Sequence, residues 1–105
     1  MKKIIQTKDA PAPIGAYNQA ILSGDTLYIS GQIALNPVSG KLEDSSIKEE
    51  TEQVMRNLKA ILQAAELDFE DVVKSSIFIS DMRNFAAINA VYSKYFDEAT
   101  APARE

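Results

Sequence analysis

Cysteine and histidine are both absent from the 105-residue sequence. Their absence excludes thiolate nucleophiles, disulfides and soft-metal sites, and it removes the side chain that most often serves as a base near neutral pH. Any chemistry must therefore come from carboxylates, arginine, lysine, tyrosine, hydroxyls and backbone amides. A cysteine-free chain also agrees with a cytoplasmic location.

Long apolar runs and an excess of positive charge are missing as well. No segment approaches the roughly 20 apolar residues of a membrane span, and the apolar start at 1–5 is too short for a signal peptide. The formal net charge is −4, and the 11 Lys and Arg residues form no dense run. An acidic surface repels phosphate backbones, so nucleic-acid binding is disfavoured. We expect a soluble cytoplasmic protein with no membrane partner.

The residues that are present describe an ordinary globular chain, 46% hydrophobic and 25% charged. This length supports one domain, 1–105, and is too short for two. Residues 4–6 favour a short edge strand. Two β-favouring segments, 20–22 and 26–30, flank Ser23-Gly24-Asp25, a sequence typical of a hairpin turn.

Two helices and a strand are expected in the second half. Ser46-Ile47-Lys48-Glu49 has the spacing of a capping box, and apolar residues recur beyond it with helical period. Residues 72–80 have the β-branched content of a strand. A second helix follows with Asp81 or Asn84 as its N-cap and an apolar stripe reaching Phe96, and Pro102 prevents its continuation.

This order of elements predicts an α+β sandwich, with two helices on one face of a mixed β-sheet. Residues 103–105 start a further strand, and the sequence stops there. A sandwich of this kind needs more strands to cover its face. We therefore expect the chain to be a fragment that lacks its C-terminal strands.

Four stretches stand out once the standard catalytic motifs are found to be absent. They are IGAYNQAI at 14–21, LYISGQI at 27–33 with NPVSGKL at 36–42, VKSSIFISDMRNFAAINAVYSKYF at 73–96, and APAR at 101–104. Together and in this order they resemble the landmarks of the RidA (YjgF) family, over nearly the whole chain. The resemblance implies a fold similar to the Bacillus type of chorismate mutase, and homotrimers with ligand sites between subunits.

The resemblance also implies an activity: hydrolysis of 2-iminopropanoate, 2-iminobutanoate and their enamine tautomers, such as 2-aminoacrylate, to 2-oxo acids and ammonia. No metal or organic cofactor is required, because these imines already hydrolyse in water. The family's water-positioning glutamate lies on a final strand that this sequence lacks. Ala16 and Glu105 depart from the family pattern, which commonly has proline and a small residue there.

Carried over residue by residue, the resemblance assigns catalytic roles to Arg104 and Tyr17. Arg104 would hold the substrate carboxylate, a task that suits its planar fork of donors. Ser30, Gly31, Asn89 and Tyr17 would complete the substrate-binding site. Without the resemblance, Arg104 would be a solvated surface arginine, Tyr17 a core-edge residue and Asn89 a solvent-facing helix residue.

Two alternative functions stay open at this point. Some family members are credited with endoribonuclease or translation-inhibitor activity, against which the acidic charge and the lack of histidine both argue. A non-catalytic module that binds small oxo acids is the other alternative.

Overall fold

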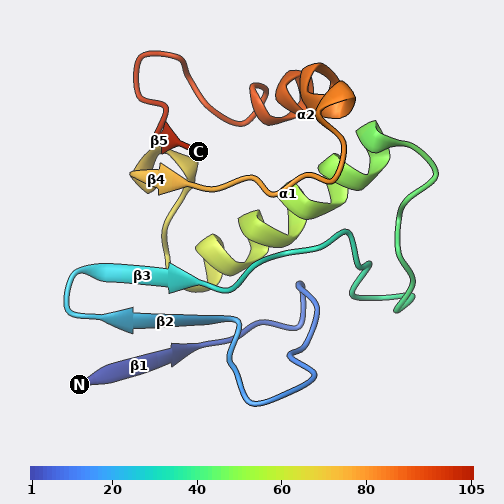
Figure 1. Ribbon diagram of the computed structural model, residues 1–105. Helices are drawn as coiled ribbons and strands as arrows, with labels where there is room; N and C mark the ends of the chain where they lie inside the picture. Colours follow the sequence, from blue (N-terminus) through green and yellow to red (C-terminus); the bar gives the residue numbers. More distant parts are fainter.

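The structure is a computed structural model that describes residues 1–105. Three strands come first, β1 (Lys2–Ile5), β2 (Ala20–Ser23) and β3 (Thr26–Ile29). They are followed by helix α1 (Ile47–Ala64), strand β4 (Lys74–Ser75), helix α2 (Phe85–Tyr92) and strand β5 (Ala103–Arg104) (Figure 1). The predicted α+β class is confirmed. The strands form two sheets, one antiparallel and one parallel.

The three N-terminal strands form an antiparallel meander in the order β1-β2-β3. The predicted hairpin is confirmed, since β2 and β3 pair from Ser23 with Thr26 to Ala20 with Ile29. Its turn contains Gly24 at φ +58°, a conformation that glycine adopts without steric cost. The predicted edge strand is also present, shifted to Lys2–Ile5.

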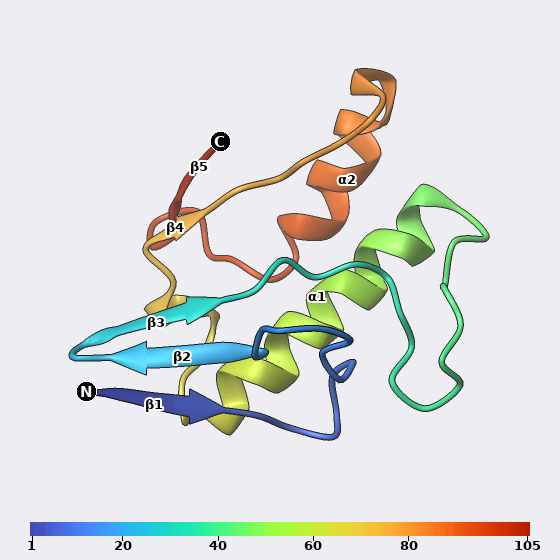
Figure 2. The ribbon, with the colours of Figure 1, turned by 60° about the horizontal axis from the view of Figure 1, so that its bottom comes forward.

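Helix α1 begins where the capping pattern predicts. Ser46 is the N-cap, and its Oγ accepts a hydrogen bond from the Glu49 N–H at 3.1 Å. Ile61 is fully buried and packs with Ile5 and Ala20, which joins α1 to the three-stranded sheet. Figure 2 shows α1 crossing behind this sheet, and α2 packs against α1.

A second core cluster connects α1 with α2. Met55 and Leu62 of α1 pack with Val91 and Tyr92 of α2 and with Phe69, which lies in a 3₁₀ helix. The ring of Phe69 also lies within 5.2 Å of the rings of Tyr95 and Phe96, measured between centroids. These contacts fix α2 on α1, and α2 in turn positions the residues around Arg104.

The strand predicted over 72–80 is much shorter in the structure. Only Lys74–Ser75 forms a strand, paired in parallel with β5, and one further bond runs from the Ile77 N–H to the Glu105 carbonyl. A β-favouring sequence becomes a strand only where a neighbouring strand satisfies its backbone groups. Residues 78–80 have no such neighbour, and Phe78 is 92% exposed.

The second helix also differs in its ends. Asp81 caps a 3₁₀ helix over Met82–Asn84 that leads into α2, whereas the Asn84 side chain forms no cap. Helix α2 ends at Tyr92, earlier than the apolar stripe predicts, so it stops well before Pro102. The stripe residues Tyr95 and Phe96 still pack on the core from the turn that follows.

Candidate functional site

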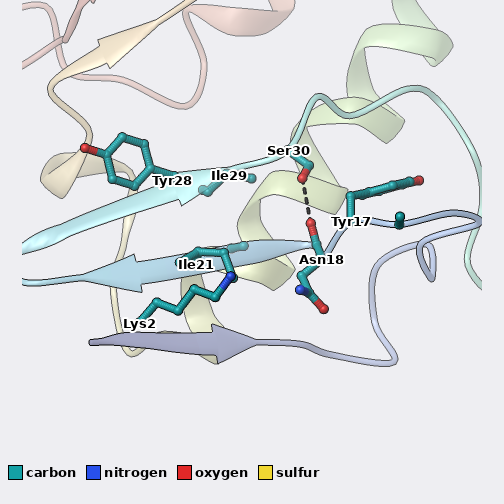
Figure 3. Close-up of a pocket in the computed structure, with 9 residues that line it drawn as sticks. Lys2, Tyr17, Asn18, Ile21, Tyr28, Ile29 and Ser30 are labelled. Carbon is teal, nitrogen blue, oxygen red and sulfur yellow. Dashed lines mark hydrogen bonds between the residues drawn. The ribbon is translucent and has the colours of Figure 1, made fainter.

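Tyr17 and Ser30 line one cavity, at the end of the sheet where β3 stops (Figure 3). Its volume is about 370 Å³, and Lys2, Asn18 and Tyr28 also contribute to its wall. Tyr17 is 50% exposed, and its hydroxyl accepts a long hydrogen bond from the Ile14 N–H at 3.4 Å. The Ser30 hydroxyl donates to the Asn18 carbonyl at 2.6 Å. The loop before β2 and the end of β3 are therefore joined at this cavity.

Gly31 follows directly and leaves its backbone open. Neither its N–H nor its carbonyl forms a hydrogen bond within the chain. A Cβ at this position would meet no atom within 4 Å. Packing inside the chain therefore does not require the glycine, and the free backbone groups are accessible to a group from outside.

Gln19 holds the cavity loop in place, and sequence reasoning missed this role. The oxygen of its buried side-chain amide accepts from the Thr7 N–H, and the two hydrogens of its Nε2 are shared among the carbonyls of Thr7, Ala10 and Pro11. The backbone carbonyl of Gln19 accepts from the Ser30 N–H at 3.0 Å. A glutamine immediately before an apolar strand was the available signal, since a buried amide needs partners for all its polar atoms.

Arg104 and Asn89 form the second group of predicted site residues. Arg104 Nη1 donates to Asn89 Oδ1 at 2.7 Å, across 15 positions of sequence. The Arg104 Cζ lies over two aromatic rings of α2, 5.5 Å from the Phe85 centroid and 4.9 Å from the Tyr92 centroid. Arg104 is exposed and belongs to none of the chain's three ion pairs. Its charge is thus supported by neutral groups only.

The two groups are not brought together within one chain. No hydrogen bond or ion pair connects Tyr17, Ser30 or Gly31 with Arg104 or Asn89. The first group lies at the antiparallel sheet and the second between α2 and β5.

Lys94, which has no partner visible in the sequence, is paired in the structure. Its Nζ donates to Glu52 of α1, and the Tyr95 hydroxyl donates to the other oxygen of that carboxylate at 2.7 Å. The hydrogen bond from Lys94 and then that from Tyr95 lower the pKa of Glu52, while burial opposes them. Burial, together with the adjacent Glu52 carboxylate, raises the pKa of Tyr95 to about 12. This cluster joins α1 to the turn after α2.

No group of three or more Asp or Glu side chains is arranged to hold a metal ion. Neither helix combines the length and the apolar character that crossing a membrane would need.

Comparisons with known proteins agree with this architecture. The family profile described as Endoribonuclease L-PSP matches residues 7–105. A RutC family protein of Synechocystis is 52% identical over 103 residues, which are 97% of this chain and 79% of that protein. The 2-iminobutanoate/2-iminopropanoate deaminase of Rattus norvegicus is 44% identical over 104 residues, 99% of this chain and 75% of the rat protein.

A solved structure gives the same result in three dimensions. The crystal structure of E. coli TdcF with bound serine superposes with a TM-score of 0.90 at 39% identity, and it covers 98% of this chain and 82% of TdcF. The profile match spans nearly the whole sequence, and the identities lie well above those of chance similarity. The chain therefore belongs to the Endoribonuclease L-PSP family, the RidA (YjgF) family of the sequence resemblance.

Proposed function

We propose that this protein hydrolyses 2-imino acids and their enamine tautomers, 2-iminopropanoate with 2-aminoacrylate and 2-iminobutanoate, to 2-oxo acids and ammonia. Its family includes proteins named for this activity, such as the rat deaminase at 44% identity. The observation that carries the proposal is the Arg104 guanidinium, which is exposed, bonded to Asn89, and free of any acidic partner.

Arg104 is the group that binds the substrate carboxylate. One of its five N–H donors is used by Asn89, and the others have no partner in the chain. A guanidinium presents donors that match a carboxylate in a paired geometry, and this holds the imine carbon in a defined position. The small amino acid bound by TdcF, serine, carries the same carboxylate.

The backbone at Ser30 and Gly31 serves the reacting centre. Water adds to C2 while the imine nitrogen takes up a proton, and the tetrahedral adduct then collapses with loss of ammonia, leaving the 2-oxo acid. The free N–H of Gly31 can donate to the oxygen of the tetrahedral adduct, and its carbonyl can accept from the nitrogen that leaves as ammonia. Tyr17 walls the cavity beside Ser30 and relays a proton through its hydroxyl.

A complete site requires the two groups to meet across subunits, so we include a homotrimer in the proposal. Several large apolar side chains are left on the surface beside the first group, with Ile14, Tyr28 and Ile33 between 63% and 91% exposed. Surfaces of this kind mark interaction sites. Sedimentation velocity should give the mass of three chains; a monomer with full activity contradicts this part of the proposal.

The decisive experiment measures ammonia released from freshly generated 2-aminoacrylate. We expect Arg104→Ala to lower kcat/KM by about 10- to 100-fold, the value of a charged hydrogen-bonded contact. Arg83→Ala is the matched control, because Arg83 is also exposed but is already paired with Asp81 at 2.7 Å. Full activity in Arg104→Ala would contradict the proposal. Binding of 2-oxobutanoate without any ammonia release would indicate a binding module instead.

The description of the family profile favours a second candidate function, endoribonuclease. The net charge of −4 and the absence of histidine argue against it. If the activity is real, RNA cleavage should persist through successive purification steps and disappear in Arg104→Ala. Cleavage that separates from the protein on purification would eliminate this candidate.

A further inference from the structure

Three side chains on one face of α2 surround the guanidinium of Arg104. Phe85, Asn89 and Tyr92 follow one another at intervals of four and three residues, which aligns them along the helix. We call these three residues the arginine cradle. We propose that Phe85 and Tyr92 are positioning residues that orient the Arg104 guanidinium for a carboxylate ligand. The inference rests on the proposed function for the identity of that ligand.

The cradle restricts both the plane and the rotation of the guanidinium. Its Cζ lies 5.5 Å from the Phe85 centroid and 4.9 Å from the Tyr92 centroid, within the range of cation–π contact. The hydrogen bond to Asn89 Oδ1 at 2.7 Å fixes one edge. Because all guanidinium donors lie in its plane, a face covered by a ring leaves the remaining edge available to a planar carboxylate.

The cradle is itself fixed from behind by Ser75. The Ser75 Oγ and the Tyr92 hydroxyl form a hydrogen bond of 2.6 Å. Ser75 is also the strand partner of Arg104 in the parallel β4–β5 pair. The same residue therefore holds the Tyr92 ring through its side chain and the Arg104 backbone through the strand. This closed arrangement leaves the guanidinium little freedom of its own.

Neutral support has a functional consequence. Aromatic rings and an amide orient the cation without cancelling its charge, whereas a carboxylate partner would occupy the donors that a ligand needs. The cradle thus places a full positive charge at the surface in one preferred orientation. Lysine could not replace Arg104 here, because an ammonium has no plane to stack and no paired donors.

The test combines a spectroscopic and a binding measurement on the full chain. Phe85→Leu removes one aromatic face at a position that is 39% exposed, so its cost to folding is small. Phe78→Leu is the control, at an exposed phenylalanine outside the cradle, and Phe85→Tyr should restore the aromatic contact. The Arg104 Nε–H signal is assigned in ¹⁵N NMR spectra by its loss in Arg104→Lys.

We expect this signal to show a ring-current shift in the wild type that decreases in Phe85→Leu and remains in Phe78→Leu. The dissociation constant of 2-oxobutanoate, measured by calorimetry, should rise by about 2- to 5-fold in Phe85→Leu. KM should rise by a similar factor with kcat unchanged, and Phe85→Tyr should reverse both changes.

The two proposals fail in different ways. An unshifted Arg104 signal in the wild type overturns the cradle, and this result does not depend on whether Phe85→Leu folds. A shift that Phe85→Leu reduces without changing the affinity for 2-oxobutanoate, or a wild type that does not bind 2-oxobutanoate, overturns the positioning role. If signal and affinity change together but no ammonia is released, the cradle stands and the deaminase proposal fails.

Discussion

Two polar clusters flank the end of α2, and they treat charge in opposite ways. In the first, Glu52 is paired with Lys94 and hydrogen-bonded to Tyr95, so the charges of both partners are neutralised within the chain. In the second, Arg104 is held by Asn89 and two aromatic rings, with no opposing charge. The first cluster also connects α1 with the turn after α2, while the second faces the surface.

The difference separates structural charge from charge that is available to a ligand. A side chain whose donors and acceptors are all satisfied inside the protein gains nothing from a small molecule. A cation oriented by neutral groups has donors to offer and keeps its electrostatic attraction. We therefore expect substitutions in the Glu52 cluster to change stability, and substitutions at Arg104 to change ligand binding.

The comparison is tested most strongly by replacing each charge with the same amide. Arg104→Gln should lower kcat/KM for 2-aminoacrylate by about 10- to 100-fold and lower the free energy of unfolding by about 1 kcal/mol at most, because its contacts with Asn89 and the two rings are exposed. Glu52→Gln should leave kcat/KM within about twofold while lowering the free energy of unfolding, because the carboxylate that it replaces is only 14% exposed and is bonded to both Lys94 and Tyr95. Ammonia release and urea unfolding are measured on both proteins. Equal loss of activity in the two variants would remove the distinction.

A third polar cluster, around Asn57 on α1, should also affect stability and not ligand binding. This residue is fully buried; its amide donates to the carbonyls of Ile33 and Leu35 at 3.1 and 3.0 Å and accepts from Gln53. Asn57→Ala leaves these groups unpaired and should cost about 2–3 kcal/mol of unfolding free energy. Lys59→Ala, at an exposed position of the same helix, should change it by less than about 0.5 kcal/mol. A loss in Asn57→Ala no greater than in this control would mean that water replaces the lost bonds.

Local signals in the sequence predict the elements that these clusters connect. Ser46 caps α1 where its spacing with Glu49 predicts, and the turn at Gly24 joins the predicted hairpin. The strand predicted over 72–80 was wrong in its extent, because that extent depends on contacts that are not local. Its extent depends on which segments lie beside it, and propensity carries no information about that.

The polar clusters were harder to predict because their members are far apart in sequence. Glu52 and Lys94 are separated by 42 positions, so no helical or strand spacing relates them. Arg104 and Asn89 were singled out through the family resemblance, and the structure adds the hydrogen bond between them. Phe85 and Tyr92 belong to the apolar stripe that the sequence predicts for the second helix. Their contact with Arg104 depends on where β5 lies, which only the folded chain determines.

The cluster of Glu52, Lys94 and Tyr95 should also make the free energy of unfolding depend on pH in the alkaline range. Burial and the Glu52 carboxylate raise the pKa of Tyr95 to about 12 from a usual value of 10.0, so the folded state holds this proton more tightly than the unfolded state. The contribution is complete below the unfolded pKa and is lost as pH rises toward 12. Urea unfolding between about pH 8 and about pH 11 should show a smaller loss in Tyr95→Phe than in the wild type. Parallel profiles would contradict the role assigned to this hydroxyl.

Salt gives the smallest expected effect and probes both clusters in one protein. Raising NaCl from about 0.05 M to about 0.5 M should weaken 2-oxobutanoate binding by about twofold, because an exposed guanidinium is readily screened. The pairing of Glu52 should respond less, since its side chain is only 14% exposed and the Tyr95 hydroxyl also bonds to it. Calorimetric titration and the urea midpoint, each referenced to Arg104→Gln and Glu52→Gln, isolate the two contributions. Binding that is insensitive to salt would mean that the ligand is held by something other than the open charge of Arg104.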